Sequence, residues 1–397
     1  MRRPSLSATL GCGLFPEGLR ASAGNAPSLS PALPGLGGGA LWPSAAWLDV
    51  HLPTRILSES STGPLPRGGN GSPRGGRPDG SPLRTPGGRG PHGGPGFSQP
   101  VPKGGYLWWY VDGISDCGQH GLTIILFVGS VFSPYYHWAG RRAEPESFCA
   151  VNVALYSPGK RRWTMTERGS AGLERNDHTY RLGPSQARWD GACLTIEIDE
   201  WNLYPIPRKV RGRVRLEPTQ LFDFQTALDS NGRHRWGPIA PSARIHATFD
   251  APDLKWSGHG YLDSNEGDEP IEGPFQRWDW CRADLSDGSV AVLYDICPTH
   301  GPDRVLALQF HADGRVTPFD PEERQVIGRT AWQVNRTIRA TPHRVRTLED
   351  TPFYARGMVE AELLGQRVLA MHETLDLPRL RSPIVKAMLP WRMPRRG

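Results

Sequence analysis

The sequence has little that would bind a metal or a nucleotide. Its cysteines, 6 in 397 residues, form no C-x-x-C pair, and none of its 12 histidines stands in an H-x-x-x-H pattern. It contains no P-loop, no G-x-S-x-G turn, and no G-x-G-x-x-G motif that opens a helix. We therefore expect neither a metal site nor a cofactor. The wide spacing of the cysteines indicates reduced thiols in a cytoplasmic setting.

Long apolar runs are also missing. The longest, LTIILFVGSVF at 122–132, is much shorter than the roughly 20 residues of a membrane-spanning helix, and its β-branched content predicts a buried strand. Glycine and proline interrupt the N-terminal apolar run, so we expect no signal peptide. The net charge of +6 comes from scattered arginines rather than a dense basic stripe. This disfavours nucleic-acid binding and is compatible with an anionic membrane surface.

Glycine and proline are abundant, with 47 and 39 residues, and they are unevenly spread. The first 92 residues are rich in them. The second half of this segment, as in RGGNGSPRGGRPDGSPLRTPGGRG, has almost no apolar residues. Such a segment cannot bury enough surface to offset the entropy lost on ordering. We predict that residues 1–92 are a disordered extension without chemistry of their own.

From Tyr106 onward, short β-branched and aromatic runs alternate with turn residues, as in YLWWYVDG, CLTIEIDEWN and SVAVLYDICP. This pattern predicts strands, with hairpin turns at SPGKRR and HADGRV and one short basic helix near the C-terminus. The expected class is all-β, with barrels or sandwiches as the options. We expect two consecutive β domains, 93–268 and 269–397, that meet in the acidic, turn-rich stretch EGDEPIEGP.

Two pairs of residues at i, i+2 spacing are the main candidates for chemistry. His234 and Trp236 lie in GRHRWGP, and Tyr261 and Asp263 lie in HGYLDSNEG, after His259. Residues i and i+2 of a strand share a face, so the two pairs would converge if their strands are neighbours. The alternative is that Asp263 only caps the turn DSNEG and that His234 is solvated in a loop.

The chemistry open to such a cluster follows from its residue types. A carboxyl group buried among aromatic rings has a raised pKa and stays protonated near neutral pH. It can then donate its proton to an alkene, and the faces of tryptophan and tyrosine stabilise the resulting cation. A nearby histidine can take a proton from the water that adds. Acid-catalysed hydration of an alkene therefore needs no cofactor.

Two longer stretches carry a family resemblance. GGYLWWYVDGISDCGQHGLTIILFVGSVFSPYYHWAGR at 104–141 and RWDWCRADLSDGSVAVLYD at 277–295 resemble the carotenoid 1,2-hydratases of phototrophic bacteria, also called hydroxyneurosporene synthases. The resemblance begins near residue 93, and residues 1–92 have no counterpart in it. It implies two lipocalin-like β halves and cofactor-independent addition of water to the terminal C1–C2 double bond of neurosporene or lycopene. The product is a 1-hydroxy carotenoid, an intermediate of carotenoid biosynthesis.

The resemblance also implies roles for the four residues. The family pattern His-x-Trp followed by Tyr-x-Asp matches this sequence at both pairs. By this likeness Asp263 protonates the alkene, Trp236 and Tyr261 stabilise the cation, and His234 handles the water or the proton of Asp263. It further implies a peripheral position at the membrane, which we place on the cytoplasmic side. The short apolar run at 122–132 and the basic WRMPRR segment are the candidate contacts, and the alternative is that this tail is solvated.

Two other readings remain open at this point. One is a lipocalin-like carrier that binds an apolar polyene without chemistry. The other is an aromatic-lined protein that binds or cleaves glycans through Asp112 and Asp116, which flank GIS beside three aromatic residues. The sequence also leaves open the preferred acyclic carotenoid and the oligomeric state.

Overall fold

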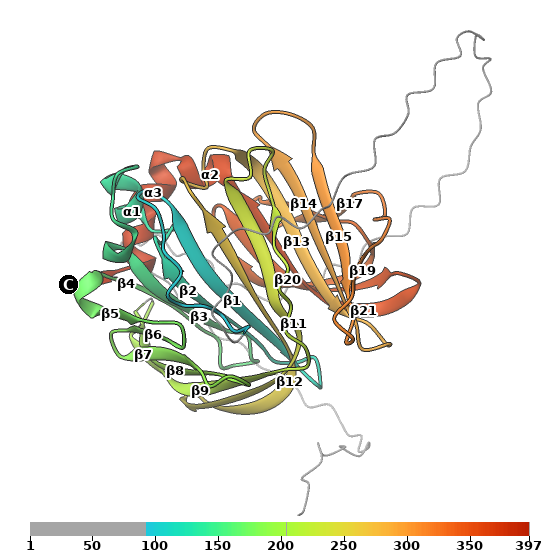
Figure 1. The fold of residues 1–397 in the computed structure, drawn as a ribbon, viewed down its shortest axis with the longest axis horizontal. Helices are drawn as coiled ribbons and strands as arrows, with labels where there is room; N and C mark the ends of the chain where they lie inside the picture. The colour runs from blue at the N-terminus through green and yellow to red at the C-terminus, as the bar shows by residue number, and fades with distance from the viewer. Residues whose placement is uncertain (1–92, 204, 397) are drawn as a thin grey trace, which may run out of the picture. The chain divides into compact units, whose positions relative to one another are not determined.

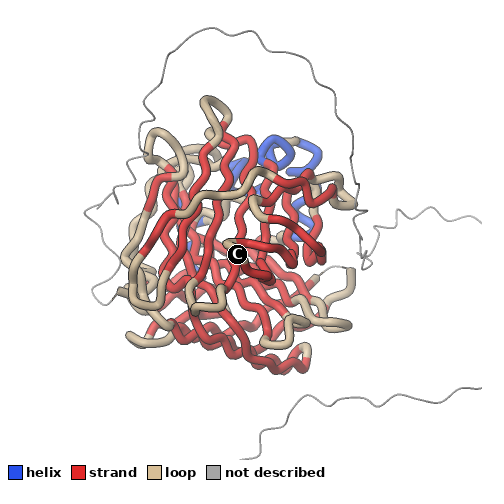
Figure 2. The backbone as a smooth tube through the Cα atoms, turned by 90° about the vertical axis from the view of Figure 1, so that its right-hand side faces the viewer, coloured by secondary structure: helices blue, strands red, loops and turns tan. Residues whose placement is uncertain are grey.

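The computed structural model describes residues 93–203 and 205–396, so the predicted disorder of residues 1–92 lies outside the described residues. Strands make up most of the described chain, and the few helices gather at one end (Figures 1 and 2). The predicted all-β class is confirmed, and the two large sheets are curled and antiparallel except at the last strand of the chain, as expected for lipocalin-like halves.

The first sheet has 13 strands and takes nearly all of its residues from the first half of the described chain. Along the sheet the strands run in the order β22-β4-β3-β2-β1-β12-β11-β9-β8-β7-β6-β5, and β10 pairs with β11. The bounds are β1 (Tyr106–Ser115), β2 (Gly121–Val128), β3 (Cys149–Leu155), β4 (Arg162–Arg168), β5 (Leu173–Arg175), β6 (Thr179–Leu182), β7 (Ser185–Trp189), β8 (Leu194–Asn202), β9 (Arg208–Pro218), β10 (Thr226–Ala227), β11 (His234–Ala251), β12 (Asp253–Gly267) and β22 (Arg395–Arg396).

The second sheet has 7 strands in the order β16-β15-β14-β13-β21-β20-β19, and β17 and β18 form a separate pair. The bounds are β13 (Phe275–Asp284), β14 (Val290–Pro298), β15 (Arg304–Phe310), β16 (Val316–Pro318), β17 (Gln325–Arg329), β18 (Asn335–Ile338), β19 (Thr341–Asp350), β20 (Tyr354–Leu363) and β21 (Gln366–Asp376). The hairpins β3–β4 and β15–β16 form at the two turns predicted for them.

The chain passes from the first sheet to the second between Gly267 and Phe275, within the stretch expected to separate two domains. The last strand, β22, returns to the first sheet and pairs in parallel with β4. The division at 268/269 into two domains therefore stays a prediction.

The helices are α1 (Pro134–Ala139), α2 (Leu377–Arg381) and α3 (Pro383–Arg392), with short 3-10 turns η1 (Pro145–Ser147) and η2 (Ser170–Gly172). The predicted C-terminal helix is confirmed as α3. Strand register places all three α-helices at one end, because α1 follows β2, whose last residue pairs near the start of β1, and α2 follows β21, whose last residue pairs near the start of β13. We call this the helical end.

Three buried cores hold these layers. One lies inside the curl of the first sheet, one inside the second, and one is shared by residues of both sheets. Along β1 the side chains alternate between two of them: Leu107 and Trp109 enter the core of the first sheet, whereas Trp108 and Tyr110 enter the shared core. This double burial follows from the strand period of two and explains why β1 reads as a continuous apolar run.

Candidate active site

Asp263 lies within β12, at the centre of the shared core rather than in a turn. Its backbone is opposite Tyr110 of β1 on one side and Pro238 of β11 on the other. The side chain is only 2% exposed. Its Oδ2 atom accepts hydrogen bonds from Trp236 Nε1 at 2.7 Å and from the Tyr261 hydroxyl at 2.8 Å. The reading of Asp263 as a turn cap is therefore wrong.

Burial raises the pKa of the Asp263 carboxyl to about 8, and the hydrogen bonds from Trp236 and Tyr261 offset part of that rise. The side chain is therefore mostly protonated at neutral pH. Since Oδ2 already accepts two hydrogens, the proton is carried on Oδ1. The nearest polar partner of Oδ1 is the side-chain Nδ2 atom of Asn265, at 3.5 Å. This nitrogen is only a donor, so it cannot accept a hydrogen bond from the Oδ1 proton.

Aromatic rings from both sheets surround this carboxyl. The Tyr261 ring lies 5.3 Å from Trp280 and 6.2 Å from Tyr110, measured between ring centroids. The Trp236 ring lies 5.6 Å from Tyr294. A positive charge that develops beside Asp263 would therefore meet the electron-rich faces of several rings in a site that excludes water.

His234 is buried at the start of β11 but does not contact Asp263. Its Nδ1 atom is 2.8 Å from the Tyr106 hydroxyl, and its ring packs edge-on against Phe275. It pairs with Gly267, four residues along β12 from Asp263, and so lies nearer the helical end. Burial lowers the pKa of His234, which keeps the imidazole neutral. Within the described residues its Nε2 atom has no hydrogen-bond partner.

The structure thus joins three of the four predicted residues by direct hydrogen bonds and holds His234 apart from them. The catalytic roles of all four remain predictions. His259 shares a face with Tyr261 but lies outside the core, with its side chain 60% exposed and 3.9 Å from Asp116.

The sequence did not predict Asn265, Tyr294 or the rings of Tyr110 and Trp280 as part of this site. Asn265 contacts Asp263, and the hydroxyl of Tyr294 on β14 donates to the Asn265 side-chain oxygen at 3.3 Å. Strand parity was the available signal for Asn265, which stands two residues after Asp263 and therefore shares its face. Tyr294 comes from the second sheet, and no local pattern indicates it.

Asp112 and Asp116 do not form a pair of catalytic carboxylates. Asp112 is fully buried in an ion pair with Arg282 of β13, whose Nε atom donates to it at 2.9 Å. Asp116 is exposed and paired with Arg244 at 2.6 Å. The glycan-cleaving reading therefore loses its structural basis, since each acid is committed to a different arginine.

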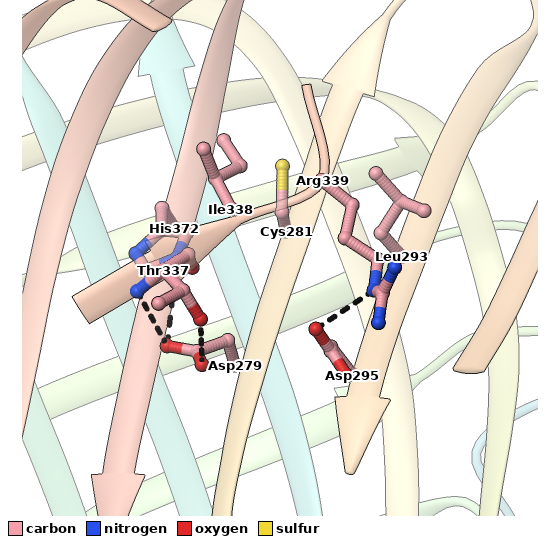
Figure 3. A pocket seen from close by; sticks show the side chains of 8 residues that line it. All are labelled: Asp279, Cys281, Leu293, Asp295, Thr337, Ile338, Arg339 and His372. Carbon is pink, nitrogen blue, oxygen red and sulfur yellow. Dashed lines mark hydrogen bonds and ion pairs between the residues drawn. The ribbon is translucent and has the colours of Figure 1, made fainter. Parts of the chain in front are cut away.

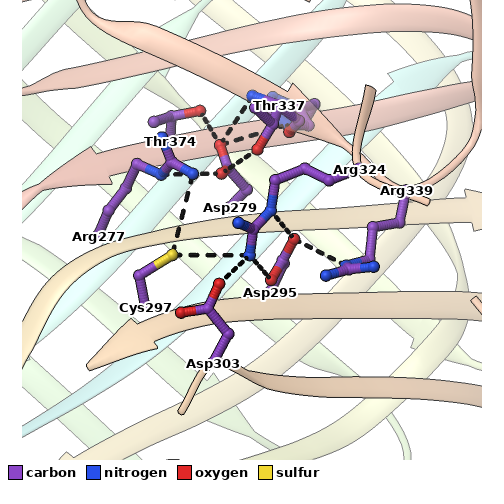
Figure 4. A network of polar contacts seen from close by, with 10 residues as sticks. Arg277, Asp279, Asp295, Cys297, Asp303, Arg324, Thr337, Arg339 and Thr374 are labelled. Carbon is purple, nitrogen blue, oxygen red and sulfur yellow. Dashed lines mark hydrogen bonds and ion pairs between the residues drawn. The ribbon is translucent and has the colours of Figure 1, made fainter. Parts of the chain in front are cut away.

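A small cavity lies inside the second sheet, on the face of β13 that points away from Asp263 and the shared core. It is lined by Asp279, Cys281, Leu293, Asp295, Thr337, Ile338, Arg339 and His372 (Figure 3). Asp279 accepts hydrogen bonds from the hydroxyls of Thr337 at 2.7 Å and Thr374 at 2.5 Å, and Asp295 is paired with Arg324 and Arg339 (Figure 4). These polar contacts tie β18 and the neighbouring loops to the sheet, which indicates a structural network.

Comparison with known proteins identifies the family. Residues 124–397 match the model described as carotenoid hydratase CrtC. The chain belongs to this family.

Two relatives named acyclic carotenoid 1,2-hydratase show how far the likeness to carotenoid hydratases extends. The relative from Rubrivivax gelatinosus is 53% identical over 385 residues, which cover 95% of each chain. The relative from Thiocapsa roseopersicina is 46% identical over 376 residues, which cover 93% of this chain and 92% of the relative. With 95% of the chain aligned, the likeness must extend into residues 1–92. The expectation that this segment has no counterpart is therefore wrong.

Among solved structures, a Nitrosomonas europaea protein described as AttH aligns with 68% of this chain and 91% of its own, at 17% identity and a TM-score of 0.49.

Proposed function

We propose that this carotenoid hydratase is an acyclic carotenoid 1,2-hydratase, a hydro-lyase that adds water across the terminal C1–C2 double bond of neurosporene or lycopene. The observation that carries the proposal is the state of Asp263: a buried carboxyl with a pKa of about 8, held between a tryptophan and a tyrosine. It supplies a proton in an apolar site without any cofactor.

In the proposed reaction, Asp263 donates its Oδ1 proton to C2 of the terminal isopropylidene group. The π electrons of the double bond form the new C–H bond, which leaves a tertiary cation at C1. The rings of Trp236 and Tyr261 and the new carboxylate stabilise this cation. Water then forms a bond to C1 and gives up one proton to His234; His234 later releases a proton and the Asp263 carboxylate takes one up, which restores both groups. The product is the 1-hydroxy carotenoid, and the net change is the addition of one water.

We assign the handling of the water proton to His234. The imidazole is neutral and buried, and its Nε2 atom has no hydrogen-bond partner within residues 93–203 and 205–396. The role needs the tautomer with the hydrogen on Nδ1, donated to the Tyr106 hydroxyl, because Nε2 then carries the lone pair that accepts the proton of an adding water. His234 pairs with Gly267, four residues along β12 from Asp263, so protonation and the handling of the water would occur at two separate points of the core.

The test is Asp263→Asn, assayed for conversion of lycopene and neurosporene with detection of the product that is heavier by one water. The variant keeps the shape and an acceptor oxygen for Trp236 and Tyr261 but has no acidic proton. We expect turnover to fall by about 10²–10⁴-fold.

Asp279→Asn is the matched control, because Asp279 is also a buried acid on a strand but lies on the far face of β13. It should retain near-normal turnover. A folded Asp263→Asn variant with normal turnover would disprove the assignment.

A carrier that binds the polyene without chemistry is the competing function. Such a protein gains nothing from a desolvated acid beside its ligand, because burying a carboxyl costs free energy. Incubation of the wild-type protein with lycopene separates the two: a shift in pigment absorbance with no change in mass would favour the carrier.

We also propose that the protein works at a membrane surface, on its cytoplasmic side, since its substrate is an apolar polyene. In the described part of the chain, no helix has the length and apolarity needed to cross a bilayer. The five described cysteines are all free.

A further inference from the structure

The helical end carries an unusual amount of exposed apolar surface. Ile384 and Trp391 of α3 are 74% and 73% exposed, the highest values among the large apolar side chains of the described residues. Trp138 of α1 is 57% exposed. Large apolar groups on one surface region, unlike single scattered ones, indicate a binding surface.

The α3 helix is apolar on both of its sides. Val385 and Leu389 face inward and pack into the shared core. The outward side carries a second stripe at i, i+3, i+4 and i+7, made of Ile384, Ala387, Met388 and Trp391. A helix on a water-facing surface needs only the inward stripe, so the outward stripe requires a partner of its own.

The neighbouring α1 helix extends this surface and is tied to α3. Its Trp138 ring packs edge-on against Tyr135 at 5.9 Å between centroids. Glu272 joins the two helices, because it pairs with His137 of α1 at 3.0 Å and with the buried Lys386 of α3. The two helices therefore present their exposed rings from one braced unit.

Charge identifies the partner. Residues 377–397 contain five arginines and one lysine and no acidic residue. Arg381, Arg392 and Arg396 are exposed there. Tryptophan and tyrosine favour the boundary between lipid headgroups and acyl chains, and arginine is attracted to anionic headgroups. A short helix with this composition is suited to lying in the plane of a membrane surface.

We infer that this surface, made of Tyr135, Trp138, Ile384, Ala387, Met388 and Trp391 and here called the docking face, binds the surface of an anionic lipid bilayer. The inward sides of α2 and α3 belong to the same continuous core that contains Trp236 and Tyr261. Docking would thus place the bilayer at the helical end, which lies nearer to His234 than to Asp263, and would supply the polyene from that end. The docking deepens the proposed membrane location, whereas the supply of substrate rests on the proposed hydratase activity.

The test is co-sedimentation of the full chain with phosphatidylcholine vesicles that contain 30% phosphatidylglycerol. A triple variant, Trp138→Ser, Ile384→Ser and Trp391→Ser, removes the three most exposed groups of the docking face. The control, Val326→Ser and Leu364→Ser, removes exposed apolar groups of β17 and of the turn between β20 and β21. We expect the docking-face variant to bind on the order of tenfold more weakly and the control to bind like wild type. Vesicles of phosphatidylcholine alone should bind the wild type more weakly than the anionic vesicles.

Equal binding of the docking-face variant and the control variant would overturn the inference. So would a wild-type dimer that the docking-face variant alone dissolves, because the face would then be an interface between two copies. Conversion of lycopene separates this inference from the proposed function. If docking supplies substrate, the docking-face variant loses turnover on vesicle-embedded lycopene and keeps it in detergent micelles. A wild type that binds vesicles but converts lycopene neither in vesicles nor in micelles would disprove the proposed function without contradicting the docking.

Discussion

At the scale of single residues, two opposing effects set the acidity of Asp263. Burial favours the neutral acid, whereas the hydrogen bonds from Trp236 and Tyr261 favour the carboxylate. Burial wins, and the resulting pKa of about 8 keeps the proton available at neutral pH while leaving it weakly enough held to be transferred. A carboxyl without the two donors would be a weaker acid, and an exposed one would have lost its proton.

The pH dependence of turnover follows from this balance. The protonated acid is the active form, so kcat should be constant below the pKa of Asp263 and fall as the pH rises through about 8. Above that value the fall should approach tenfold per pH unit, since one proton is lost. The measurement is kcat between pH 5.5 and pH 10 with micellar lycopene. A rate that increases through this alkaline range would show that the carboxylate, not the acid, is active.

Replacing Tyr261 by phenylalanine should move this alkaline limb to higher pH. The Tyr261 hydroxyl donates to Oδ2 and lowers the pKa of Asp263, so its removal raises that pKa further. Turnover at neutral pH should also fall, because the orientation of the carboxyl is less well fixed. Tyr294→Phe is the control, since the Tyr294 hydroxyl donates to Asn265 instead of Asp263. A limb shifted downward in Tyr261→Phe would contradict the assigned hydrogen bond.

At the scale of elements, a buried ion pair joins β1 of the first sheet to β13 of the second. Asp112 and Arg282 are both fully buried, and Arg282 also pairs with Asp284. Arg282→Leu should lower the free energy of unfolding by about 3–5 kcal/mol, because it leaves the Asp112 carboxyl without its partner. Replacing both residues by leucine should recover much of this loss. Urea unfolding of the two single variants and the double variant measures the coupling.

The exposed pair of Asp116 and Arg244 provides the comparison for that experiment. Arg244→Leu should change the free energy of unfolding by less than about 1 kcal/mol, since the pair is solvated. If Arg282→Leu has an equally small effect, the buried pair does not hold the two sheets together.

Strand patterns predicted much at this scale, and their limits have a physical cause. Alternation along β12 placed Tyr261 and Asp263 on one face, and turn residues located the hairpins. The same alternation gave no orientation for β1, because both of its faces are buried. The partners of the site that come from the second sheet, Tyr294 and Trp280, depend on contacts between distant strands. Local sequence carries no signal for such contacts.

At the scale of the whole molecule, the two sheets depend on each other. The aromatic side chains that surround Asp263 come from β1, β11 and β12 on one side and from β13, β14 and β15 on the other. Neither sheet alone encloses the carboxyl, so the raised pKa is a property of their association. The sequence predicted two groups of strands, before and after residue 268. It did not indicate that the proposed active site lies in the core shared by the two sheets.

The C-terminal residues connect the second half of the chain back to the first sheet, because β22 follows the helices and pairs with β4. Its Arg395 forms an ion pair with Glu167, a side chain that is only 1% exposed and whose pKa burial raises. Deleting residues 394–397 should lower the free energy of unfolding by about 1–3 kcal/mol through the loss of this partner and of the strand pairing. The loss should be larger at pH 8 than at pH 5, since the unpaired carboxyl is ionised at the higher pH and protonation relieves its burial at the lower.

Arg396→Ala is the matched control for this deletion. It keeps the strand and Arg395, and it should change the unfolding midpoint in urea very little. A deletion whose effect is the same at both pH values would assign the stabilisation to the backbone pairing of β22 alone. A deletion without effect would show that the end of the chain does not fasten the second half to the first. The pH-dependent loss is expected because the only cation that the structure pairs with Glu167, among the described residues, comes from the other end of the chain.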